Sequence, residues 1–454
     1  MISLKKIDKK DINIIEDLQI KSFSCYSEIK ELNLKKEKTF LKLPTMLLER
    51  PNFLIFKVIL SEKIIGALYI KIIKSNICEI YRLFIDPLFQ GLGYGSQAIS
   101  EIISLTPRFT DYYLYTPKCF RNNESFYSKN GFIVEDEVMD RHGFIKLKFH
   151  KKIERKALTA LKPSDGGLHL GHLVGNIEPL IKYQNVYNCT FMFADMQVRN
   201  IDNKYYNWQV LKENMKLMLK QMIALGLDVE KVNIRIESKI KKNAFDEFIF
   251  FSDFIKNTRL QRLPLMKHII QENKNIKMSI LNYPILQTLD FTINDADLVF
   301  SNGDNQACIE LINELIKKIN SSSFRSYKTV KLLTGKVSLL EGIDGMKMSK
   351  SKNNCIFLTD TNEQIRKKVN KMFTDSNRTS EGIPGNISQN IVFKYLFVFA
   401  NEKLYNDLKT KYENGEIGDS KLKNILSEIL IDKIEKYRKK FETISDKLID
   451  DLLS

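Results

Sequence analysis

Apolar positions in the first third of the chain occur in short runs that alternate with helically spaced stretches. The run Cys78–Ile85 predicts a strand, which Asp86 and Pro87 end, and Ser96–Ser104 has the spacing of an amphipathic helix. A further short strand is predicted at Ile145–Phe149. Strands that alternate with helices predict an α/β domain over residues 1–150.

A second set of elements begins after the basic stretch at residues 149–155, which reads FHKKIER. Lys156–Leu161 predicts a strand that leads into a glycine-containing loop, and beyond Ser351 the pattern becomes helical. Thr361 and Gln364 have the spacing of a capping box. A long helix is predicted from apolar residues at helical spacing: Leu422, Ile425, Leu426, Ile429, Ile434, Tyr437 and Phe441.

The composition is that of a folded chain with a basic surface. Its 454 residues include 43% hydrophobic positions, which excludes a disordered chain, and the formal net charge is +16. The positive excess is spread almost evenly along the chain. It is consistent with a polyanionic partner and equally with a basic surface that has none.

Cysteine and histidine usage excludes two classes of small scaffold. The six cysteines are scattered without a C-x-x-C pair, and there are only five histidines, so neither a disulfide framework nor a zinc ribbon is expected. The opening MISLKKIDKKD lacks an apolar signal core, and apolar runs such as Phe53–Leu60 are too short to span a bilayer. We therefore expect a soluble, cytoplasmic, reduced protein with no membrane partner.

A glycine-rich loop follows the strand predicted at Cys78–Ile85. The sequence Gln90-Gly91-Leu92-Gly93-Tyr94-Gly95 leads into the predicted helix. Glycines let backbone N–H groups approach a diphosphate, and the helix N-terminus adds partial positive charge. A glycine-rich turn with no ligand is the simpler alternative for such a loop taken alone.

The surrounding residues resemble the GNAT acetyltransferases. The run I-D-P-x-x-Q-G-L-G-Y-G is similar to that family's acetyl-CoA pyrophosphate loop, and residues 126–132, FYSKNGF, are similar to its F-Y-x-K-x-G-F segment. The resemblance implies a GNAT fold and implies that Tyr127 returns a proton to the departing CoA thiolate. It implies that acetyl-CoA is bound by Gln90, Gly91, Gly93, Tyr94 and Gly95.

The acetyl acceptor is an open question. Transfer to an amine needs a general base, and Glu79 on the predicted strand is the candidate. A solvent-facing strand carboxylate is at least as good an interpretation of Glu79. Arg121, Asn122 and Asn123 also differ from the commonest family spacing upstream of Tyr127.

Two histidines fall in the tetrapeptide His169-Leu170-Gly171-His172, between a strand with its loop and a helical segment. Such a turn places two imidazoles beside a helix N-terminus, where they can donate hydrogen bonds to phosphates as charge develops. A metal pair or chance clustering are the alternatives. Metal is the weaker of these, because no third ligand lies nearby in sequence.

A lysine-rich loop lies 178 residues further on, counted as 347 − 169. Lys347-Met348-Ser349-Lys350-Ser351 carries two ammonium groups that can close on a triphosphate and stabilise the leaving pyrophosphate. A surface loop is the alternative for this segment alone. The interval between the two motifs has room for a Rossmann-type domain with an insertion.

H-L-G-H together with K-M-S-K-S resembles the class I aminoacyl-tRNA synthetases, and the intervening segments resemble the tryptophanyl family. These segments are residues 159–176 (TALKPSDGGLHLGHLVGN), 193–197 (FADMQ) and 283–290 (YPILQTLD). The resemblance implies that Asp290 accepts a hydrogen bond from the indole N–H, and that Gln197 and Tyr283 lie in the same pocket. An ordinary helix carboxylate is the alternative for Asp290.

The resemblance also assigns the nucleotide site and the reaction. His169, His172, Lys347 and Lys350 would be catalytic, and ATP would contact Gly171, Met348, Ser349 and Asp304. ATP with Mg²⁺ would activate tryptophan, which would then pass to tRNA(Trp). The basic residues at 366–371 and 433–440 are candidates for following the RNA backbone, although a solvated helix face explains them equally well.

Some positions depart from the family pattern. Residues 299–305 read VFSNGDN where the family has V-P-x-G-x-D-Q, so Asn302 and Asn305 replace Gly and Gln while Asp304 keeps the ribose-binding position. Only 103 residues follow Ser351, a short C-terminal region. Trp208, the only tryptophan, is expected to be a packing residue.

We therefore predict a fusion: a GNAT domain over 1–150, a Rossmann-type class I synthetase domain over 151–355, and a helical region over 356–454 that contacts the anticodon. Family members are homodimers, which implies a dimer through the synthetase domain. The acetyltransferase would act on the amine of a tryptophan analogue, its adenylate or the aminoacyl-tRNA. The alternatives are a synthetase-like module that binds without charging and targets the acetyltransferase, and a tyrosyl synthetase.

Overall fold

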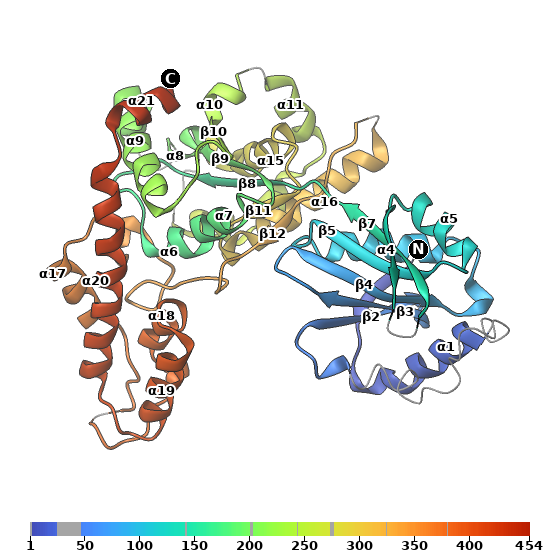
Figure 1. The fold of residues 1–454 in the computed structure, drawn as a ribbon. Helices are drawn as coiled ribbons and strands as arrows, with labels where there is room; N and C mark the ends of the chain where they lie inside the picture. The colour runs from blue at the N-terminus through green and yellow to red at the C-terminus, as the bar shows by residue number, and fades with distance from the viewer. Residues whose placement is uncertain are drawn as a thin grey trace. The chain divides into compact units, whose positions relative to one another are not determined.

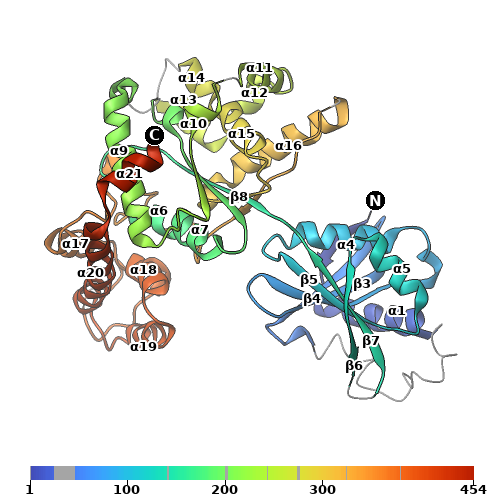
Figure 2. The ribbon, with the colours of Figure 1, turned by 45° about the horizontal axis from the view of Figure 1, so that its top comes forward.

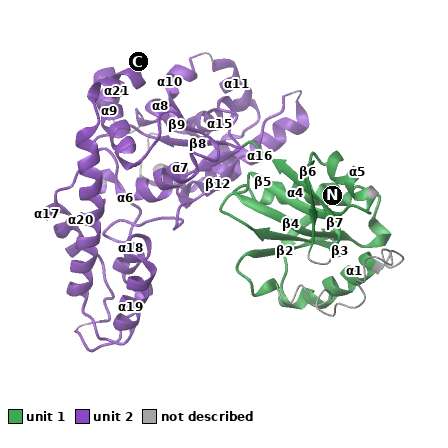
Figure 3. Cartoon of the chain, viewed as in Figure 1, with its two compact units in different colours: residues 1–154 green, residues 155–454 purple. Residues whose placement is uncertain are grey.

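The computed structural model describes residues 2–24, 47–140, 143–199, 203–242, 244–272, 277–323, 325–378 and 380–454. The chain divides into two compact units, Met1–Glu154 and Arg155–Ser454 (Figure 3). The last strand of the first unit continues past residue 150: β7 runs over Ile145–Lys152, and Lys152 pairs with Asp111. The helical region from 356 onward lies within the second unit.

The first unit is built on a seven-stranded sheet with the order β1-β2-β3-β4-β5-β7-β6 (Figure 1). All neighbouring strands are antiparallel except β4 and β5, which are parallel. The strands are β1 (Ser3–Lys6), β2 (Phe53–Leu60), β3 (Lys63–Ile72), β4 (Ile77–Ile85), β5 (Asp111–Pro117), β6 (Ile133–Met139) and β7. The helices are α1 (Ile12–Ser24), α4 (Tyr94–Leu105) and α5 (Arg121–Lys129), with short 3₁₀ turns η1 (Lys9–Asp11) and η3 (Pro87–Phe89).

Helices cover both faces of this sheet because its side chains alternate. In β3, Leu68 and Ile70 belong to the apolar core that includes α4, whereas Ala67 and Tyr69 belong to the core that includes α1. The predicted strand and helix around the glycine loop are confirmed as β4 and α4, and α4 begins at Tyr94, two residues earlier than expected.

The only parallel pair among these described strands diverges along its length. β4 and β5 pair only over Ile77–Glu79 and Asp111–Tyr113, although each strand continues for several more residues. A bulge shifts the register between β3 and β4 at Tyr69/Ile70, which leaves Tyr81 as an extra residue in β4. The backbone of β4 beyond Glu79 is therefore not paired with β5.

The second unit contains a five-stranded parallel sheet with the order β10-β9-β8-β11-β12 (Figure 1). Its strand β8 is also labelled in the turned view of Figure 2. The strands are β8 (Lys156–Leu161), β9 (Asn188–Phe193), β10 (Val232–Ile236), β11 (Leu298–Phe300) and β12 (Lys331–Leu333). The chain builds outward from β8 in one direction and then returns to its other side. The order therefore reverses at β8, and the crevice outside the carboxyl ends of β8 and β11 is a switch point of the Rossmann type.

Helices again cover both faces of the sheet. Ala157 and Leu161 of β8 share a core with α9 and the C-terminal helices, whereas Leu158 packs with α15 and α16. The helices before β11 are α6 (Leu170–His172), the π-helical turn η4 (Leu173–Ile177), α7 (Glu178–Tyr183), α8 (Asp195–Val198), η5 (Asn203–Tyr206), α9 (Trp208–Leu225), α10 (Glu237–Ile240), α11 (Phe245–Asp253), α12 (Asn257–Leu260), α13 (Pro264–Glu272), α14 (Met278–Leu281) and α15 (Tyr283–Ile293). After β11 come η6 (Gly303–Asn305), α16 (Gln306–Ser322) and η7 (Lys350–Lys352).

The C-terminal region is helical, as predicted. It comprises α17 (Asn362–Asn370), η8 (Ile387–Gln389), α18 (Ile391–Phe399), α19 (Glu402–Glu413), α20 (Asp419–Thr443) and α21 (Asp446–Leu453). The capping box is confirmed, because Thr361 Oγ1 accepts from the N–H of Gln364 at 3.2 Å and Gln364 Oε1 accepts from the N–H of Thr361 at 2.8 Å. Leu422 and Leu426 of α20 are buried in the core that also contains Ala157.

One packing expectation is wrong. Trp208 is the first residue of α9, and 44% of its surface is exposed, so it is not a core residue. In the part of the chain that the structure describes, no helix has the length and apolar character needed to cross a bilayer.

The shared core predicts that α20 is needed for the stability of the second unit. Replacing the fully buried Leu426 by Ala should cost about 2–5 kcal/mol, because it removes methyl groups and leaves a cavity. Urea unfolding of the full chain measures this change. Lys421→Ala, on the same helix at an exposed position, should change the free energy of unfolding by less than about 0.5 kcal/mol. Equal effects of the two substitutions would contradict this packing.

Candidate active sites

The loop after β8 is held at the switch point by its own glycines. Gly166 and Gly167 have φ angles of +79° and +68°, which only glycine adopts readily. A Cβ on Gly167 would lie 2.5 Å from Gln221 Oε1, and this oxygen accepts from the N–H of Leu168 at 2.8 Å. The loop therefore rests directly on a buried side chain of α9, and this contact positions the two-histidine turn that follows.

His169 and His172 lie against each other at the start of α6. Their rings stack with centroids 3.6 Å apart. His169 Nδ1 accepts from the N–H of Gly171 at 3.1 Å, so the proton of this ring is assigned to Nε2. Burial lowers the pKa of His169 to about 3, and burial also lowers the pKa of His172 well below its ordinary value. Both imidazoles are neutral at pH 7.

The lysine loop lies against this turn although it is distant in sequence. The N–H of Leu170 donates to the carbonyl of Ile356 at 3.0 Å, and the N–H of Leu358 donates to the carbonyl of Leu168 at 3.0 Å. Met348 is buried, and a Cβ on Gly171 would lie 2.8 Å from its sulfur. The structure thus brings together Gly171 and Met348, two of the residues expected to contact ATP.

The two lysines of the loop are directed to opposite strands of the switch point. Lys350 Nζ donates to the Ser164 carbonyl at 3.1 Å and to Ser164 Oγ at 2.9 Å, next to the end of β8. Burial lowers the pKa of Lys350 to about 8. Lys347 forms an ion pair with Asp304, which follows β11. The N–H of Ser349, between them, donates to Asn354 Oδ1 at 2.8 Å.

Asn302 and Asn305, which depart from the family pattern, both contact residues close to the β11 loop. Asn302 Nδ2 lies 3.5 Å from Asn176 Oδ1, and a Cβ on Gly175 would overlap the Asn302 side chain at 1.9 Å. Asn305 Nδ2 donates to Ser301 Oγ at 2.7 Å. These asparagines hold the β11 loop against η4 and against itself, and neither hydrogen bond involves Asp304.

Asp290 and Gln197, both expected in the amino-acid pocket, are in direct contact. Gln197 Nε2 donates to Asp290 Oδ2 at 2.8 Å, and Asp290 is 2% exposed. Two further charged residues adjoin them. Lys241 Nζ lies 2.5 Å from Asp290 Oδ1 and donates to Glu237 Oε1 at 2.7 Å. Sequence reasoning missed both residues.

Tyr283, the third residue expected in this pocket, is beside another basic residue that sequence reasoning missed. Lys162 Nζ lies 4.8 Å from the centroid of the Tyr283 ring. Burial and, to a smaller extent, the nearby Lys347 charge lower the pKa of Lys162 to about 8, and the Glu237 charge opposes this change. Its position directly after β8 was the available signal, because residues at the carboxyl ends of parallel strands line the ligand crevice.

In the first unit the glycine loop is open to ligand. Gly91 and Gly93 have φ angles of +75° and +81°, and a Cβ on either would have no neighbour within 4 Å. Gly93 is the N-cap of α4, so the N–H groups of Tyr94 and Gly95 belong to the first turn of that helix. A Cβ on Gly95 would lie 3.1 Å from the Phe126 ring, so this glycine serves helix packing.

Gln90 and Tyr127 have structural contacts of their own. Gln90 Nε2 donates to the carbonyl of Ile85 at 2.8 Å, which ties the start of the loop to the end of β4. Tyr127 is half-buried on α5, and its ring lies 5.0 Å from Phe126 and 5.6 Å from Phe149 between centroids. The side chain of Arg121 lies outside the described residues.

Glu79 lies at the point where β4 and β5 diverge. Its side chain is 14% exposed, so it is not a solvent-facing carboxylate, and it lies 3.8 Å from Lys71 Nζ. Burial raises the pKa of Glu79 above its ordinary value, and the Lys71 charge opposes this rise. A carboxylate with a raised pKa beside unpaired strand backbone is suited to accepting a proton from an amine.

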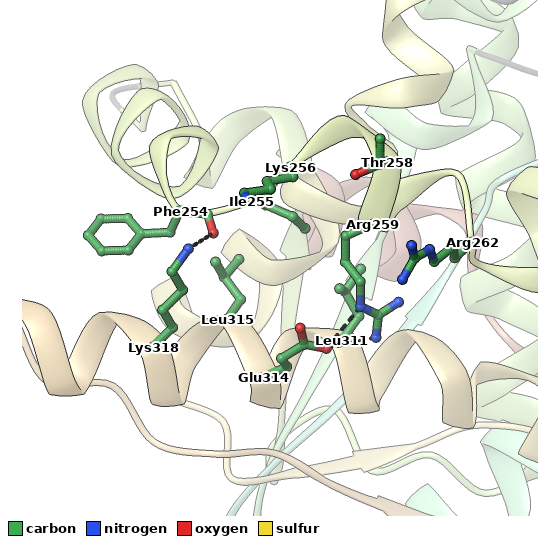
Figure 4. Close-up of a pocket in the computed structure, with 10 residues that line it drawn as sticks. All are labelled: Phe254, Ile255, Lys256, Thr258, Arg259, Arg262, Leu311, Glu314, Leu315 and Lys318. Atoms are coloured by element: carbon green, nitrogen blue, oxygen red, sulfur yellow. Dashed lines mark hydrogen bonds and ion pairs between the residues drawn. The ribbon is translucent and has the colours of Figure 1, made fainter.

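A hollow elsewhere in the second unit contains none of the predicted site residues. It has a volume of about 390 Å³ and lies beside α12 and α16 (Figure 4). Arg259 donates to Glu314 at 2.8 Å and Lys318 donates to the Phe254 carbonyl at 2.8 Å along its wall.

Within the described ranges, no group of three His, Cys, Asp or Glu side chains is arranged to hold a metal ion.

These geometries define two classes of enzyme. The second unit is a Rossmann-type nucleotide-binding unit, with a two-histidine turn and a lysine loop at its switch point. Residues 151–434 match the profile of the tRNA synthetases class I (W and Y), and residues 14–132 match that of the Acetyltransferase (GNAT) family. The chain belongs to the class I tRNA synthetases of the W and Y group, and it carries an N-terminal GNAT domain. Both predicted resemblances are confirmed.

The most similar relatives include tryptophan–tRNA ligases. That of Chlamydia caviae is 32% identical over 305 residues, which cover 63% of this chain and 85% of the relative. That of Borreliella burgdorferi is 33% identical over 280 residues, 60% of this chain and 79% of the relative. In both cases the matched part is long enough to include the whole sheet and both motifs.

Solved structures with the same fold include two tryptophanyl-tRNA synthetases. The Mycoplasma pneumoniae structure gives a TM-score of 0.57 at 24% identity and covers 66% of this chain and 91% of that chain. The Campylobacter jejuni structure, solved with ADP and tryptophan, gives a TM-score of 0.54 at 23% identity and covers 66% of this chain and 92% of that one. These likenesses establish the fold of the second unit.

The burial of His169 predicts a loss of stability in acid. Its pKa of about 3 in the folded state is below the ordinary 6.5, so from pH 6.5 downward the unfolded state takes up a proton that the folded state does not. Each such histidine lowers the free energy of unfolding by about 1.4 kcal/mol per pH unit in this window. Urea unfolding between pH 7 and pH 4 measures the slope of the free energy of unfolding against pH. This slope should be smaller for His169→Gln than for the wild type. Equal slopes for the two proteins would contradict the assigned burial.

Proposed function

We propose that the second unit activates tryptophan with ATP and transfers it to tRNA(Trp), while the first unit transfers an acetyl group from acetyl-CoA to an amine. The observation that carries the first part is the buried contact of Asp290 with Gln197, in the same unit as the two-histidine turn and the lysine loop. A carboxylate in a buried pocket favours a partner with an N–H donor over a side chain without one.

The residues at the switch point suit adenylate formation. The substrate carboxylate attacks the α-phosphate of ATP, and the bond from that phosphorus to the pyrophosphate oxygen breaks. His169, neutral and protonated on Nε2, supplies a hydrogen-bond donor, and Lys347 and Lys350 supply positive charge for the leaving pyrophosphate. Asp304 would accept hydrogen bonds from the ribose hydroxyls once Lys347 leaves it for the phosphates.

Mg²⁺ would enter with the nucleotide. Phosphate oxygens and waters supply most of the ligands of this ion in nucleotide enzymes, and the ion would neutralise charge on the transferring phosphates. The chain's own contribution is the placement of the lysine ammonium groups. Lys350 is already held beside the β8 loop by Ser164.

Transfer to tRNA would use the helical region, in a cytoplasmic homodimer formed through this unit. Several of the basic side chains expected to follow the RNA backbone form ion pairs within the unit. Lys368 lies 2.7 Å from Asp360, Lys433 lies 2.8 Å from Glu178, and Lys436 lies 2.6 Å from Asp432. Phosphate contacts by these residues would require exchange of the internal partner for a phosphate.

In the first unit, Glu79 would accept a proton from the acceptor amine as its nitrogen attacks the acetyl carbonyl. The bond from that carbonyl to sulfur then breaks, and Tyr127 would give its hydroxyl proton to the CoA thiolate. The open backbone of Gly91 and Gly93 and the first turn of α4 suit the pyrophosphate of CoA. The proposed acceptors are tryptophan analogues, tryptophanyl adenylate and tryptophanyl-tRNA, because both units share one chain.

Tryptophan-dependent exchange of pyrophosphate into ATP tests the synthetase. Lys347→Met and Lys350→Met should each lower kcat by about 10²–10³-fold, since each removes a charge from the developing pyrophosphate. Lys352→Met is the matched control, because Lys352 lies in the same 3₁₀ turn as Lys350 and is exposed. It should leave the exchange rate unchanged.

The same assay decides between this proposal and its alternatives. Exchange with tyrosine but not with tryptophan would indicate a tyrosyl enzyme. No exchange with either amino acid, together with retained tRNA binding, would indicate a binding module that targets the acetyltransferase. Exchange with tryptophan in the wild type that is unaffected in the Lys347 and Lys350 variants would contradict the assigned roles.

Labelled acetyl-CoA tests the first unit. With tryptophan, a non-hydrolysable tryptophanyl adenylate and tryptophanyl-tRNA as acceptors, label should appear on the α-amine of at least one. Glu79→Gln should lower the rate by about 10²–10⁴-fold, because it removes the base. Glu62→Gln, an exposed carboxylate in the turn between β2 and β3, is the control. Label on an unrelated amine alone would contradict the proposed acceptor class.

A further inference from the structure

We propose that Lys241 and Glu237 together set the ionisation of Asp290, and that Lys241 is thereby a positioning residue for tryptophan recognition. This inference rests on the proposed function of the second unit, in which Asp290 accepts a hydrogen bond from the indole N–H. Lys241 does not have to touch the substrate in this role. It acts through the carboxylate that does.

The three residues form a closed network inside the unit. Their side chains are 3%, 0% and 2% exposed for Lys241, Glu237 and Asp290. The Lys241 ammonium lies 2.5 Å from Asp290 Oδ1 and donates to Glu237 Oε1 and to the Leu286 carbonyl, each at 2.7 Å. Among the described residues, Asp290 Oδ1 has no hydrogen-bond partner, so its contact with Lys241 is an ion pair and this oxygen can still accept a hydrogen bond.

Gln197 joins the two carboxylates from the other side. Its Nε2 donates to Asp290 Oδ2 at 2.8 Å and lies 3.3 Å from Glu237 Oε1. Glu237 is further held by the N–H of Met196, which donates to its Oε2 at 3.1 Å. The carboxylates are thus fixed on both sides by donors from α8 and from the C-terminal end of α10.

The charges in this network do not cancel. One ammonium faces two carboxylates, so the cluster carries a net charge of −1 in a buried setting when all three groups are ionised. Lys162, beside the Tyr283 ring, interacts with Glu237 and has a pKa lowered to about 8 by burial, so it also titrates in this region. Tyr283 on the same helix as Asp290 and Cys308 on α16 are two further titratable groups near Asp290. Burial raises the pKa of the Tyr283 hydroxyl and raises that of the Cys308 thiol to about 12, so both are neutral at pH 7. Lys241 and Glu237 are therefore the charges that decide the state of Asp290.

The two neighbours act in opposite directions. Burial raises the pKa of Asp290, the Lys241 charge lowers it, and the Glu237 charge raises it. Although burial lowers the pKa of Lys241, the charges of Asp290 and Glu237 raise it above its ordinary value, so Lys241 stays charged. Together these effects raise the pKa of Asp290 to about 7, and without Lys241 it would rise further, so that the carboxyl would be protonated at neutral pH.

The state of Asp290 matters for the choice of amino acid. An ionised carboxylate only accepts hydrogen bonds, which suits the indole N–H, a donor with no acceptor. A protonated carboxyl can donate a hydrogen bond to a phenol oxygen. An indole has no acceptor for such a bond. An ionised carboxylate accepts from the phenol O–H as well, so protonation of Asp290 removes the hydrogen bond to an indole but leaves one to a phenol. By lowering the pKa of Asp290, Lys241 thus limits the advantage that protonation would give to tyrosine.

Calorimetric titration of tryptophan into the full chain between pH 5.5 and pH 9 tests this inference. Wild-type affinity should fall as the pH drops through the pKa of Asp290. Lys241→Met should move this midpoint up by at least one pH unit, which corresponds to about tenfold weaker binding on the acid side. Glu237→Gln should move it down. Lys241→Arg, which keeps the charge, should leave the midpoint near that of the wild type.

The opposite shifts of the pH midpoint in Lys241→Met and Glu237→Gln distinguish this role from a merely structural one. A packing defect would weaken binding in both the Lys241→Met and Glu237→Gln variants without moving their midpoints apart, and that result would overturn the inference. If Lys241→Met does not fold, the Glu237→Gln and Lys241→Arg curves still decide the outcome. Lys239→Met is the matched control, because this exposed lysine of α10 donates to the carbonyls of Leu453 and Ser454, at 3.3 and 2.7 Å, and not to the carboxylates of the network.

Failure of the proposed function would look different. In that case the wild-type chain would bind no tryptophan at any pH. Binding by the wild type with midpoints that coincide in all variants would leave tryptophan recognition standing and reject the role of Lys241. Exchange assays with tyrosine should also show its relative rate rising at least several-fold in Lys241→Met and staying constant in Lys239→Met.

Discussion

The pairing of residues 355–358 with the two-histidine turn is the constraint on which the nucleotide site depends. Two backbone hydrogen bonds, from Leu170 to Ile356 and from Leu358 to Leu168, join segments that lie almost two hundred residues apart in the chain. They place Met348 over Gly171 and direct Lys350 toward the β8 loop. The parallel sheet forms one side of the crevice, and the segment held by these two backbone hydrogen bonds forms the other.

The amino-acid pocket is governed by a different compromise. Burying charged groups is costly unless they are paired and hydrogen-bonded. The cluster around Asp290 meets this requirement in part: Gln197 donates to Oδ2 and Lys241 pairs with Oδ1, but Oδ1 has no hydrogen-bond partner in the described chain. Such a cluster is a weak source of stability. In the proposed function its value would be specificity, since Gln197 and Lys241 fix the carboxylate and leave one oxygen of Asp290 able to accept from the substrate.

The sequence pattern predicted those helices and strands well whose formation depends on residues close together in sequence. The bounds of β8, the capping box at Thr361 and the helical spacing in α20 depend on alternation and capping alone. Lys241 and Lys162 could not be found this way, because what distinguishes them from other lysines is burial and proximity to carboxylates or rings distant in sequence. Trp208 was misjudged because a large apolar side chain at the first position of a helix has no preceding turn to cover it.

The ion pair between Lys347 and Asp304 has a kinetic consequence. If Asp304 binds the ribose and Lys347 the phosphates, as proposed, their ion pair would compete with the nucleotide for both residues. Entry of the nucleotide would replace this ion pair by hydrogen bonds from the ribose hydroxyls to Asp304 and by an ion pair of Lys347 with a phosphate. Both new contacts would form only when a ligand carries the sugar and the phosphates together. Phosphate alone would pair with Lys347 and leave Asp304 without a partner, and a nucleoside alone would bind Asp304 and leave Lys347 without one. In the proposed function the loop would thereby favour intact nucleotides over their fragments before any chemistry occurs.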